Sequence, residues 1–196
     1  MNLIDRAKNI ILSPKTEWDA VANEEPNIQQ IITGYVIPLA LISAIASFVG
    51  YGLVGAPFLG ASVTWGIVQA IIVIFTAVLA VIIAAFVVDA LAPSFGSQKN
   101  MGRAVQLFAY SMTPAWIGGI FNIYPPLGIL GSLFGLFGLY LLYLGFTPLM
   151  QTPEDKKVGY IIVSIVVLIV VYIILGVILS AIFLGIFGLS MLGAYG

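Results

Sequence analysis

Long apolar stretches without a charged side chain alternate with short charged segments along this chain, and this pattern limits what the chain can fold into. Of its 196 residues, 61% are hydrophobic and 8% are charged, whereas about 25% of the residues of a soluble domain are charged. A soluble fold of this size leaves too much of its surface in water to hide so much apolar area. The sequence therefore predicts an all-α fold, a polytopic transmembrane helical bundle.

Five apolar stretches are long enough to cross a bilayer, since about 18 uncharged apolar residues indicate a spanning helix. We place the spans near residues 31–51, 63–88, 104–121, 127–150 and 158–180. The last apolar run continues to residue 192. As one helix it would be about 50 Å long, against a hydrocarbon core of about 30 Å. One long span, a span with a re-entrant tail, and two spans therefore stay open for 158–192.

The connectors between these five spans differ sharply in charge. Every Lys and Arg lies in the segment before the first span, in 91–103 or in 151–157, which five crossings place on one side of the membrane. The connectors 52–62 and 122–126 and the C-terminal tail carry no charge. By the positive-inside rule, the charged side is cytoplasmic and so is the N-terminus. We expect a cytoplasmic interfacial segment, residues 1–30, followed by a transmembrane domain, residues 31–196.

The N-terminal segment has the pattern of two short amphipathic helices. Apolar residues recur at helical spacing between Leu3 and Ile11, with charged residues between them, as in a helix that lies in the membrane interface. Ser13 and Pro14 then begin a second helix, on which we interpret Trp18 as an interfacial anchor. Two interpretations stay open: a docking element for a partner, or an anchor that covers the cytoplasmic ends of the spans. We favour the anchor.

A small set of polar positions and one proline are the candidates for function near or within the spans. Asp89 is expected at the cytoplasmic end of the second span, within reach of Lys99 or Arg103, because the preceding 63–83 already span about 30 Å. We interpret it as half of an interfacial ion pair rather than a proton or cation site. The full set of candidate positions is Asp89, Lys99, Arg103, Gln106, Tyr110 and Pro114.

Glycines on the fourth expected span predict close helix packing. Gly128, Gly131, Gly135 and Gly138 follow one another at steps of three, four and three residues, which places them on one helical face. The Gly118-Gly119 pair on the third span is a candidate partner for this face. Such glycine-lined faces also allow an oligomer.

Several kinds of chemistry are excluded by composition. The chain has no Cys and no His, so thiolate chemistry, His-ligated metals and His-based triads are ruled out. We predict no catalytic residues, no cofactor and no metal site, and we interpret the chain as no enzyme. A net charge of −1 gives no basic field that would attract nucleic acid. The expected partners are membrane lipids and a protein partner at the cytoplasmic face.

Three segments of the chain resemble parts of a known membrane protein family. SPKTEWDAVANEEP, ahead of the first span, is similar to the opening of the prokaryotic members of the Yip family, membrane proteins named for interaction with Ypt/Rab GTPases in eukaryotes. AVQLFAYSMTPAWIGGI, which holds Tyr110 and Pro114, resembles the Tyr-x-x-x-Pro third span of the family. YLLYLGF, followed by a loop of proline, acidic residues and lysines, is similar to the exit of its fourth span.

This resemblance implies five spans and a cytoplasmic N-terminus. It also implies, for the eukaryotic relatives, roles in vesicle trafficking, membrane shaping and recruitment of prenylated GTPases. The acidic Asp-Leu-Tyr-Gly-Pro signature of the eukaryotic N-terminal region is not found here. We therefore expect the prokaryotic type, located in the cytoplasmic (inner) membrane as a multi-pass protein.

Two hypotheses for function follow. The first is a non-enzymatic protein that organises membrane, or binds lipid or a partner, through the N-terminal helices and cytoplasmic loops, because the charges gather on one side. The alternative is a passive channel or facilitator for a small solute or ion. The path of such a channel would be lined by Gln69, Thr76, Gln106, Tyr110 and Asn122.

Overall fold

The computed structural model describes residues 2–55 and 60–183, with side chains to residue 174, and every regular element in this part is helical. In chain order the elements are α1 (Leu3–Leu12), α2 (Pro14–Ala22), α3 (Ile28–Ile31), η1 (Ile32–Val36), α4 (Ile37–Ser47), η2 (Phe48–Val54), α5 (Val63–Leu91), η3 (Ala92–Phe95), α6 (Met101–Ser111), α7 (Thr113–Gly118), η4 (Gly119–Ile123), η5 (Pro125–Leu127), α8 (Gly128–Met150) and α9 (Glu154–Phe183). The prediction of an all-α fold is confirmed.

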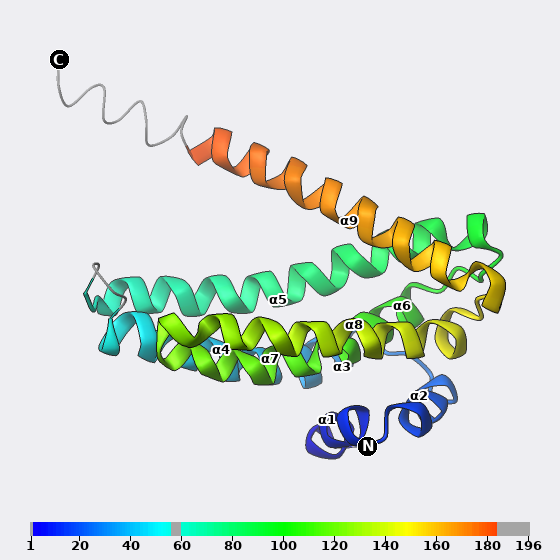
Figure 1. Cartoon of the computed structure of the whole chain (residues 1–196), viewed down its shortest axis with the longest axis horizontal. Helices are drawn as coiled ribbons and strands as arrows, with labels where there is room; N and C mark the ends of the chain where they lie inside the picture. Colours follow the sequence, from blue (N-terminus) through cyan, green and yellow to red (C-terminus); the bar gives the residue numbers. More distant parts are fainter. Residues whose placement is uncertain (1, 56–59, 184–196) are drawn as a thin grey trace.

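The long helices run side by side, as Figure 1 shows. Helices α4, α5, α7 and α8 lie roughly parallel in one layered bundle, and α9 leaves the bundle at an angle after packing on α5 near its start. Helices α1 and α2 pack across the outside of this bundle, near the end that holds the α8–α9 connection. Among the described residues, four helices are long and apolar enough to cross a membrane: Ile28–Val54, Val63–Phe95, Pro125–Met150 and Glu154–Ile174.

The third expected span, 104–121, is not one long helix. It is divided into α6, α7 and the 3-10 turn η4. Pro114 has no amide hydrogen, so it cannot donate to the carbonyl of Tyr110 four residues earlier. The Thr113 hydroxyl donates to that carbonyl instead, at 2.7 Å, and the helix is interrupted at Met112. The sequence predicted this segment as one spanning helix, and the interruption at Met112 and Pro114 divides it.

The first spanning helix is also irregular. It is continuous from Ile28 to Val54 but includes two wide π-type segments, η1 and η2. The first of these lies directly before Pro38, and the Ile37 amide donates to the carbonyl of Ile32, five residues earlier. Wider turns of this kind often occur at functional sites in helices. Here η1 forms part of the wall of the cavity described below.

Glycines on α8 do bring helices close together. A Cβ atom on Gly131 would lie 2.8 Å from the carbonyl oxygen of Gly118, and one on Gly138 would lie 2.8 Å from that of Ser111. Gly135 differs from this expectation, because a Cβ atom there would meet nothing within 4 Å. The glycine face is therefore used for packing within the chain, against α6 and α7.

The apolar run at the C-terminal end forms a single helix as far as Phe183. Residues 184–196 are outside the described part, so the choice among a long span, a re-entrant tail and a second span for 158–192 falls there. Over Glu154–Ile174, α9 is long and apolar enough to cross a bilayer, and little of its surface is covered by the rest of the chain.

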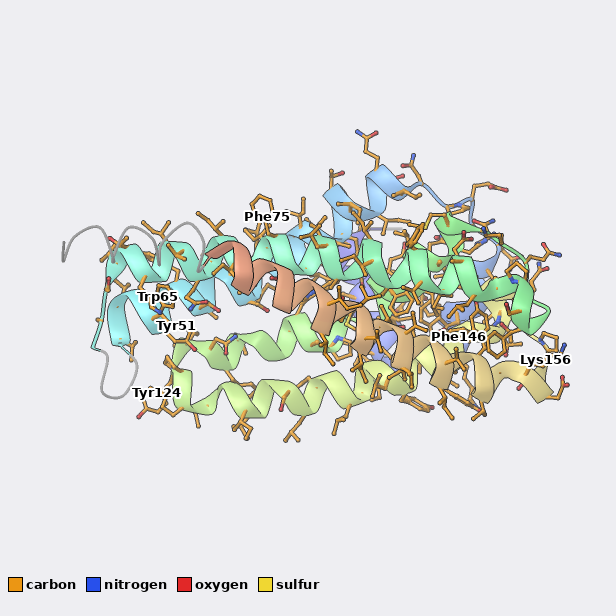
Figure 2. The ribbon with its side chains drawn as sticks, turned by 90° about the horizontal axis from the view of Figure 1, so that it is seen from above. Tyr51, Trp65, Phe75, Tyr124, Phe146 and Lys156 are labelled. Atoms are coloured by element: carbon orange, nitrogen blue, oxygen red, sulfur yellow. The ribbon has the colours of Figure 1, made fainter. Side chains whose placement is uncertain are left out.

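The outer surface of the bundle fits a membrane. Large apolar side chains such as Phe75, Ile129 and Ile173 are exposed on the outside of α5, α8 and α9. In Figure 2, Tyr51, Trp65 and Tyr124 gather at one end of the bundle and Lys156 lies at the other. Tyr and Trp are enriched at membrane–water interfaces, and Lys on the cytoplasmic side. The two ends of the bundle therefore have different interfacial chemistry.

Candidate functional site

Helices α1 and α2, with the turn that follows them, form what we call the N-terminal cap, residues 2–25. Its inner surface is part of the protein core, because Ile10, Trp18 and Val21 are almost completely buried. The Trp18 ring fills the space beside Gly145, where a Cβ atom would lie 2.7 Å from the indole. The interpretation of Trp18 as an interfacial anchor is therefore wrong: at 1% exposure it packs on α8, where a larger residue than glycine would displace it.

A buried arginine lies between this cap and the bundle. The Arg6 side chain is only 5% exposed and donates to Glu17 at 2.6 Å and to Glu24. Its guanidinium lies over the ring of Tyr110, 5.1 Å from the centroid, in the range of a cation–π contact. Arg6 therefore joins α1, α2 and α6 at one point.

The ion pairs keep Arg6 charged although it is buried. Burial by itself lowers the pKa of the guanidinium. The hydrogen bond to Glu24 and the neighbouring charges of Glu24 and Glu17 outweigh burial and raise the pKa above its ordinary value. The removal of Arg6 would thus leave the carboxylate of Glu17, 7% exposed, in the core without a cation.

A second layer of contacts supports the ring of Tyr110. Tyr35 packs edge-on against it, with centroids 4.8 Å apart, and the Tyr35 hydroxyl is 2.7 Å from that of Thr113. Since the Thr113 hydrogen goes to the Tyr110 carbonyl, Tyr35 is the donor. The Thr113 hydroxyl, which lies at the interruption before Pro114, thus accepts the hydrogen bond that holds Tyr35 in place.

Arg103 makes a separate link between the cap and α6. Its Nη1 donates to the carbonyl oxygen of Val21 at 2.8 Å and to Oε1 of Gln106 at 3.1 Å. The carbonyl of Val21 lies in the last turn of α2, where a cation is favourable because carbonyls lack helical partners. Gln106 is thereby oriented beside the cap.

A cavity of about 380 Å³ opens between the cap, the start of the first spanning helix and α6, and we call it the polar pocket. Most of its lining is polar. Its walls are Asn2, Leu3, Arg6, Glu24, Glu25, Asn27, Gln30, Ile31, Gly34, Tyr35, Gln106 and Tyr110. Its volume lies within the range of about 300–1,000 Å³ of ligand sites, but its lining is more polar than is typical of them.

A comparison with models of protein families identifies the family to which this fold belongs. The model of the Yip1 domain matches residues 8–178, which is most of the chain. The chain belongs to the Yip1 family. The proteins of this family are generally non-enzymatic membrane proteins with several transmembrane helices, and this chain is a multi-pass membrane protein. Neither the curated proteins nor the solved structures give a significant match.

The candidate residues occupy three separate places in this Yip1-family structure. Gln106 and Tyr110 line the polar pocket. Arg103 is not part of the lining but donates a hydrogen bond to Gln106. Pro114 is on α7, where it interrupts the helix and lines a smaller apolar cavity near Ile11. Two of the candidate positions, Gln106 and Tyr110 on α6, therefore line the polar pocket.

Asp89 and Lys99 are at a different position: Asp89 lies in the last turn of α5, and Lys99 lies in the connector that follows η3. Their charged atoms are 3.9 Å apart, with Lys99 largely exposed and Asp89 mostly covered. Asp89 is thus paired with Lys99 and not with Arg103, while the position of this pair at the membrane interface stays a prediction. The Tyr160 hydroxyl also donates to the carbonyl of Val88 next to it, so the pair lies where α9 joins α5.

Of the residues suggested for a solute path in this Yip1-family chain, only Gln106 and Tyr110 line one of the three cavities described here. Gln69, Thr76 and Asn122 line none of the described cavities, and Thr76 is exposed on the outside of α5. Gln106 and Tyr110 alone share a cavity, and it lies under the N-terminal cap. No observation in the described part of the chain favours the channel hypothesis.

Sequence reasoning missed the residue at the centre of the site. Arg6 was counted among the polar residues of an amphipathic helix. It lies three residues after Leu3 and four before Ile10, and this spacing puts it on the apolar face. A charge on the buried face of a helix requires a partner, and that signal was present in the sequence.

Proposed function

We propose that this Yip1-family protein is a non-enzymatic, membrane-organising protein that binds lipid or a protein partner at its N-terminal cap. The observation that supports this is the buried Arg6, which holds α1, α2 and the following turn together through ion pairs and contacts the ring of Tyr110 on α6. A cap fixed in this way presents a defined surface at the membrane interface. It also forms one side of the polar pocket, which is open to the surface.

The outer surface of the cap has the composition of an interfacial helix. Ile4 and Leu12 are 74% and 68% exposed on α1, while Lys8 and Lys15 are exposed nearby. Apolar side chains of this kind insert between lipids, and lysines are attracted to anionic headgroups. The cap is thus suited to contact both the bilayer and a partner bound to it.

We also propose five crossings with a cytoplasmic N-terminus. The interrupted helical segment 101–123 packs along α8, and it begins and ends at opposite ends of the bundle in Figure 1. All Lys and Arg are then on one side, as the positive-inside rule requires. The resemblance of the opening segment to the prokaryotic members supports our proposal of the prokaryotic type and of the cytoplasmic membrane.

Site-specific photo-crosslinking in native membranes tests the proposed binding. A benzoylphenylalanine at Ile4 or Lys15, on the exposed side of the cap, is expected to give severalfold more adduct than one at Asp155. Asp155 is also exposed, on a charged connector, but outside the cap. Mass spectrometry of the adducts distinguishes phospholipid from one defined protein. Equal yields at all three positions would contradict a binding role for the cap.

A further inference from the structure

A second cavity adjoins the polar pocket along helix α1. This apolar groove, as we call it, has a volume of about 440 Å³. Its walls are Leu3, Ile4, Ala7, Lys8, Ile11, Leu12, Pro38, Leu39, Ile42 and Ile117. Leu3 lines both cavities, so a polar and an apolar compartment meet at this side chain.

The two compartments follow each other in depth along the first spanning helix. Gly34 lines the polar pocket, whereas Pro38 and Ile42 line the apolar groove. At about 1.5 Å per helical residue, Pro38 and Ile42 lie roughly 6 and 12 Å beyond Gly34 along the helix axis. The cavity therefore changes from polar to apolar in the direction in which a lipid changes from headgroup to acyl chain.

The charges around the polar pocket favour a cationic group. Its lining contains one cation, Arg6, and two carboxylates, Glu24 and Glu25. Arg6 is already paired with Glu17 behind the pocket and with Glu24, so the negative charge of exposed Glu25 is not balanced from within the lining. The neutral side chains Gln30 and Gln106 add hydrogen-bonding groups. An anionic headgroup would meet repulsion from these carboxylates.

The cation of the apolar groove is Lys8 on α1, five residues after Leu3, the side chain at which the compartments meet. Lys8 is exposed and lines the groove. A zwitterionic phospholipid carries a phosphate between its glycerol and its amine. With its amine among the carboxylates and its chain in the groove, its phosphate would be near α1, where Lys8 supplies a positive charge.

We propose that these two compartments together bind one phospholipid with a primary-amine headgroup, such as phosphatidylethanolamine. The ammonium group binds in the polar pocket near Glu25 and Glu24, and one acyl chain occupies the apolar groove between α1 and α4. A primary ammonium donates three hydrogen bonds to carboxylate and amide oxygens. The quaternary amine of a choline headgroup has the same charge but no N–H to donate. This inference rests on the proposed lipid-binding role of the cap.

Native mass spectrometry of the full chain in detergent tests this site. Phosphatidylethanolamine, phosphatidylcholine and phosphatidylglycerol of the same acyl chains are added separately at equal concentration. We expect phosphatidylethanolamine to bind about tenfold more tightly than the other two, because the choline headgroup has no N–H to donate and the glycerol headgroup has no cation for the carboxylates. Equal binding of the three lipids would overturn the inference.

Two variants with matched controls locate the lipid. Glu25→Gln is expected to remove most of the headgroup preference, whereas Asp19→Asn, an equal charge change on the exposed side of α2, leaves it intact. Ile42→Trp fills the apolar groove and is expected to weaken lipid binding about tenfold. Ile45→Trp, on the same helix, exposed and outside the groove, is expected to have no such effect.

The outcomes separate this inference from the proposed function. If neither Glu25→Gln nor Ile42→Trp changes binding while adducts still form at Ile4, the inference fails and the binding role of the cap stands. If no lipid binds and no adduct exceeds that at Asp155, both fail. A melting measurement on each variant verifies that it is folded. Because Glu25 is exposed, we expect Glu25→Gln to disturb folding less than Ile42→Trp does.

Discussion

Replacement of Arg6 with methionine is expected to lower the free energy of unfolding by about 3–5 kcal/mol, because one partner of a buried ion pair is removed. The Glu17 carboxylate is 7% exposed and would be left in the core without a cation. Glu24 contributes less, because its side chain is 42% exposed and water solvates it. Unfolding of the purified protein in mixed micelles with increasing denaturing detergent measures the loss.

Two comparisons make this prediction specific to the ion pair. Lys8→Met, a charge removed from the exposed side of the same helix, is expected to change stability by no more than about 0.5 kcal/mol. The double variant Arg6→Met/Glu17→Met is expected to recover much of the loss, since a buried pair replaced by apolar residues is often neutral. Similar effects of Arg6→Met and Lys8→Met would show that the cap is not fixed by this pair.

Replacement of Trp18 with alanine is the other change for which we expect a large effect, about 3–5 kcal/mol. The indole is 1% exposed and contacts the α8 backbone at Gly145 and, at a centroid distance of 6.2 Å, the ring of Tyr110. Its Nε1 has no hydrogen-bond partner among the described residues. The loss is therefore one of packing, from a cavity left beneath α2.

The control for this prediction is Trp65→Ala. Trp65 is 45% exposed and is seen at the opposite end of the bundle in Figure 2, so its removal leaves no internal cavity. The same unfolding measurement, combined with protease sensitivity of the cap, checks both variants. Equal destabilisation by the two substitutions, or a cap equally protected in Trp18→Ala and the parent chain, would contradict the packing described here.

The long helices could be predicted from the sequence because hydropathy and length depend only on local residues. The predicted span 63–88 lies within α5, and 127–150 corresponds to α8 with one residue more at its start. The third stretch, 104–121, has no charged residue and was therefore predicted as a span too, although it is less apolar than the other four. Its division depends on the Thr113 hydroxyl, which satisfies the carbonyl that Pro114 leaves free. The hydrogen bond from this hydroxyl replaces the one that the amide of residue 114 would make, and hydropathy does not predict such a replacement.

The candidate site was predicted only in part because its contacts join distant segments. Gln106 and Tyr110 were identified as polar residues in an apolar stretch, and they do line the pocket. The partners of Arg6 are 11 and 18 residues away, on another helix and its turn. The periodicity of α1 alone does not say what its buried face will meet. Trp18 was placed at the interface for the same reason, since Gly145 lies far along the chain.

The central claim is that the cap and all charged connectors share one side of a bundle with five crossings. The chain has no cysteine, so single cysteines can be labelled with a membrane-impermeant thiol reagent in intact cells. We expect labelling of Ala61→Cys and Ile123→Cys from outside, and labelling of Lys15→Cys, Ser94→Cys and Asp155→Cys only after the membrane is opened. Protection of Ile123→Cys together with Ser94→Cys would show that 101–123 does not cross, and external labelling of Lys15→Cys would contradict the account.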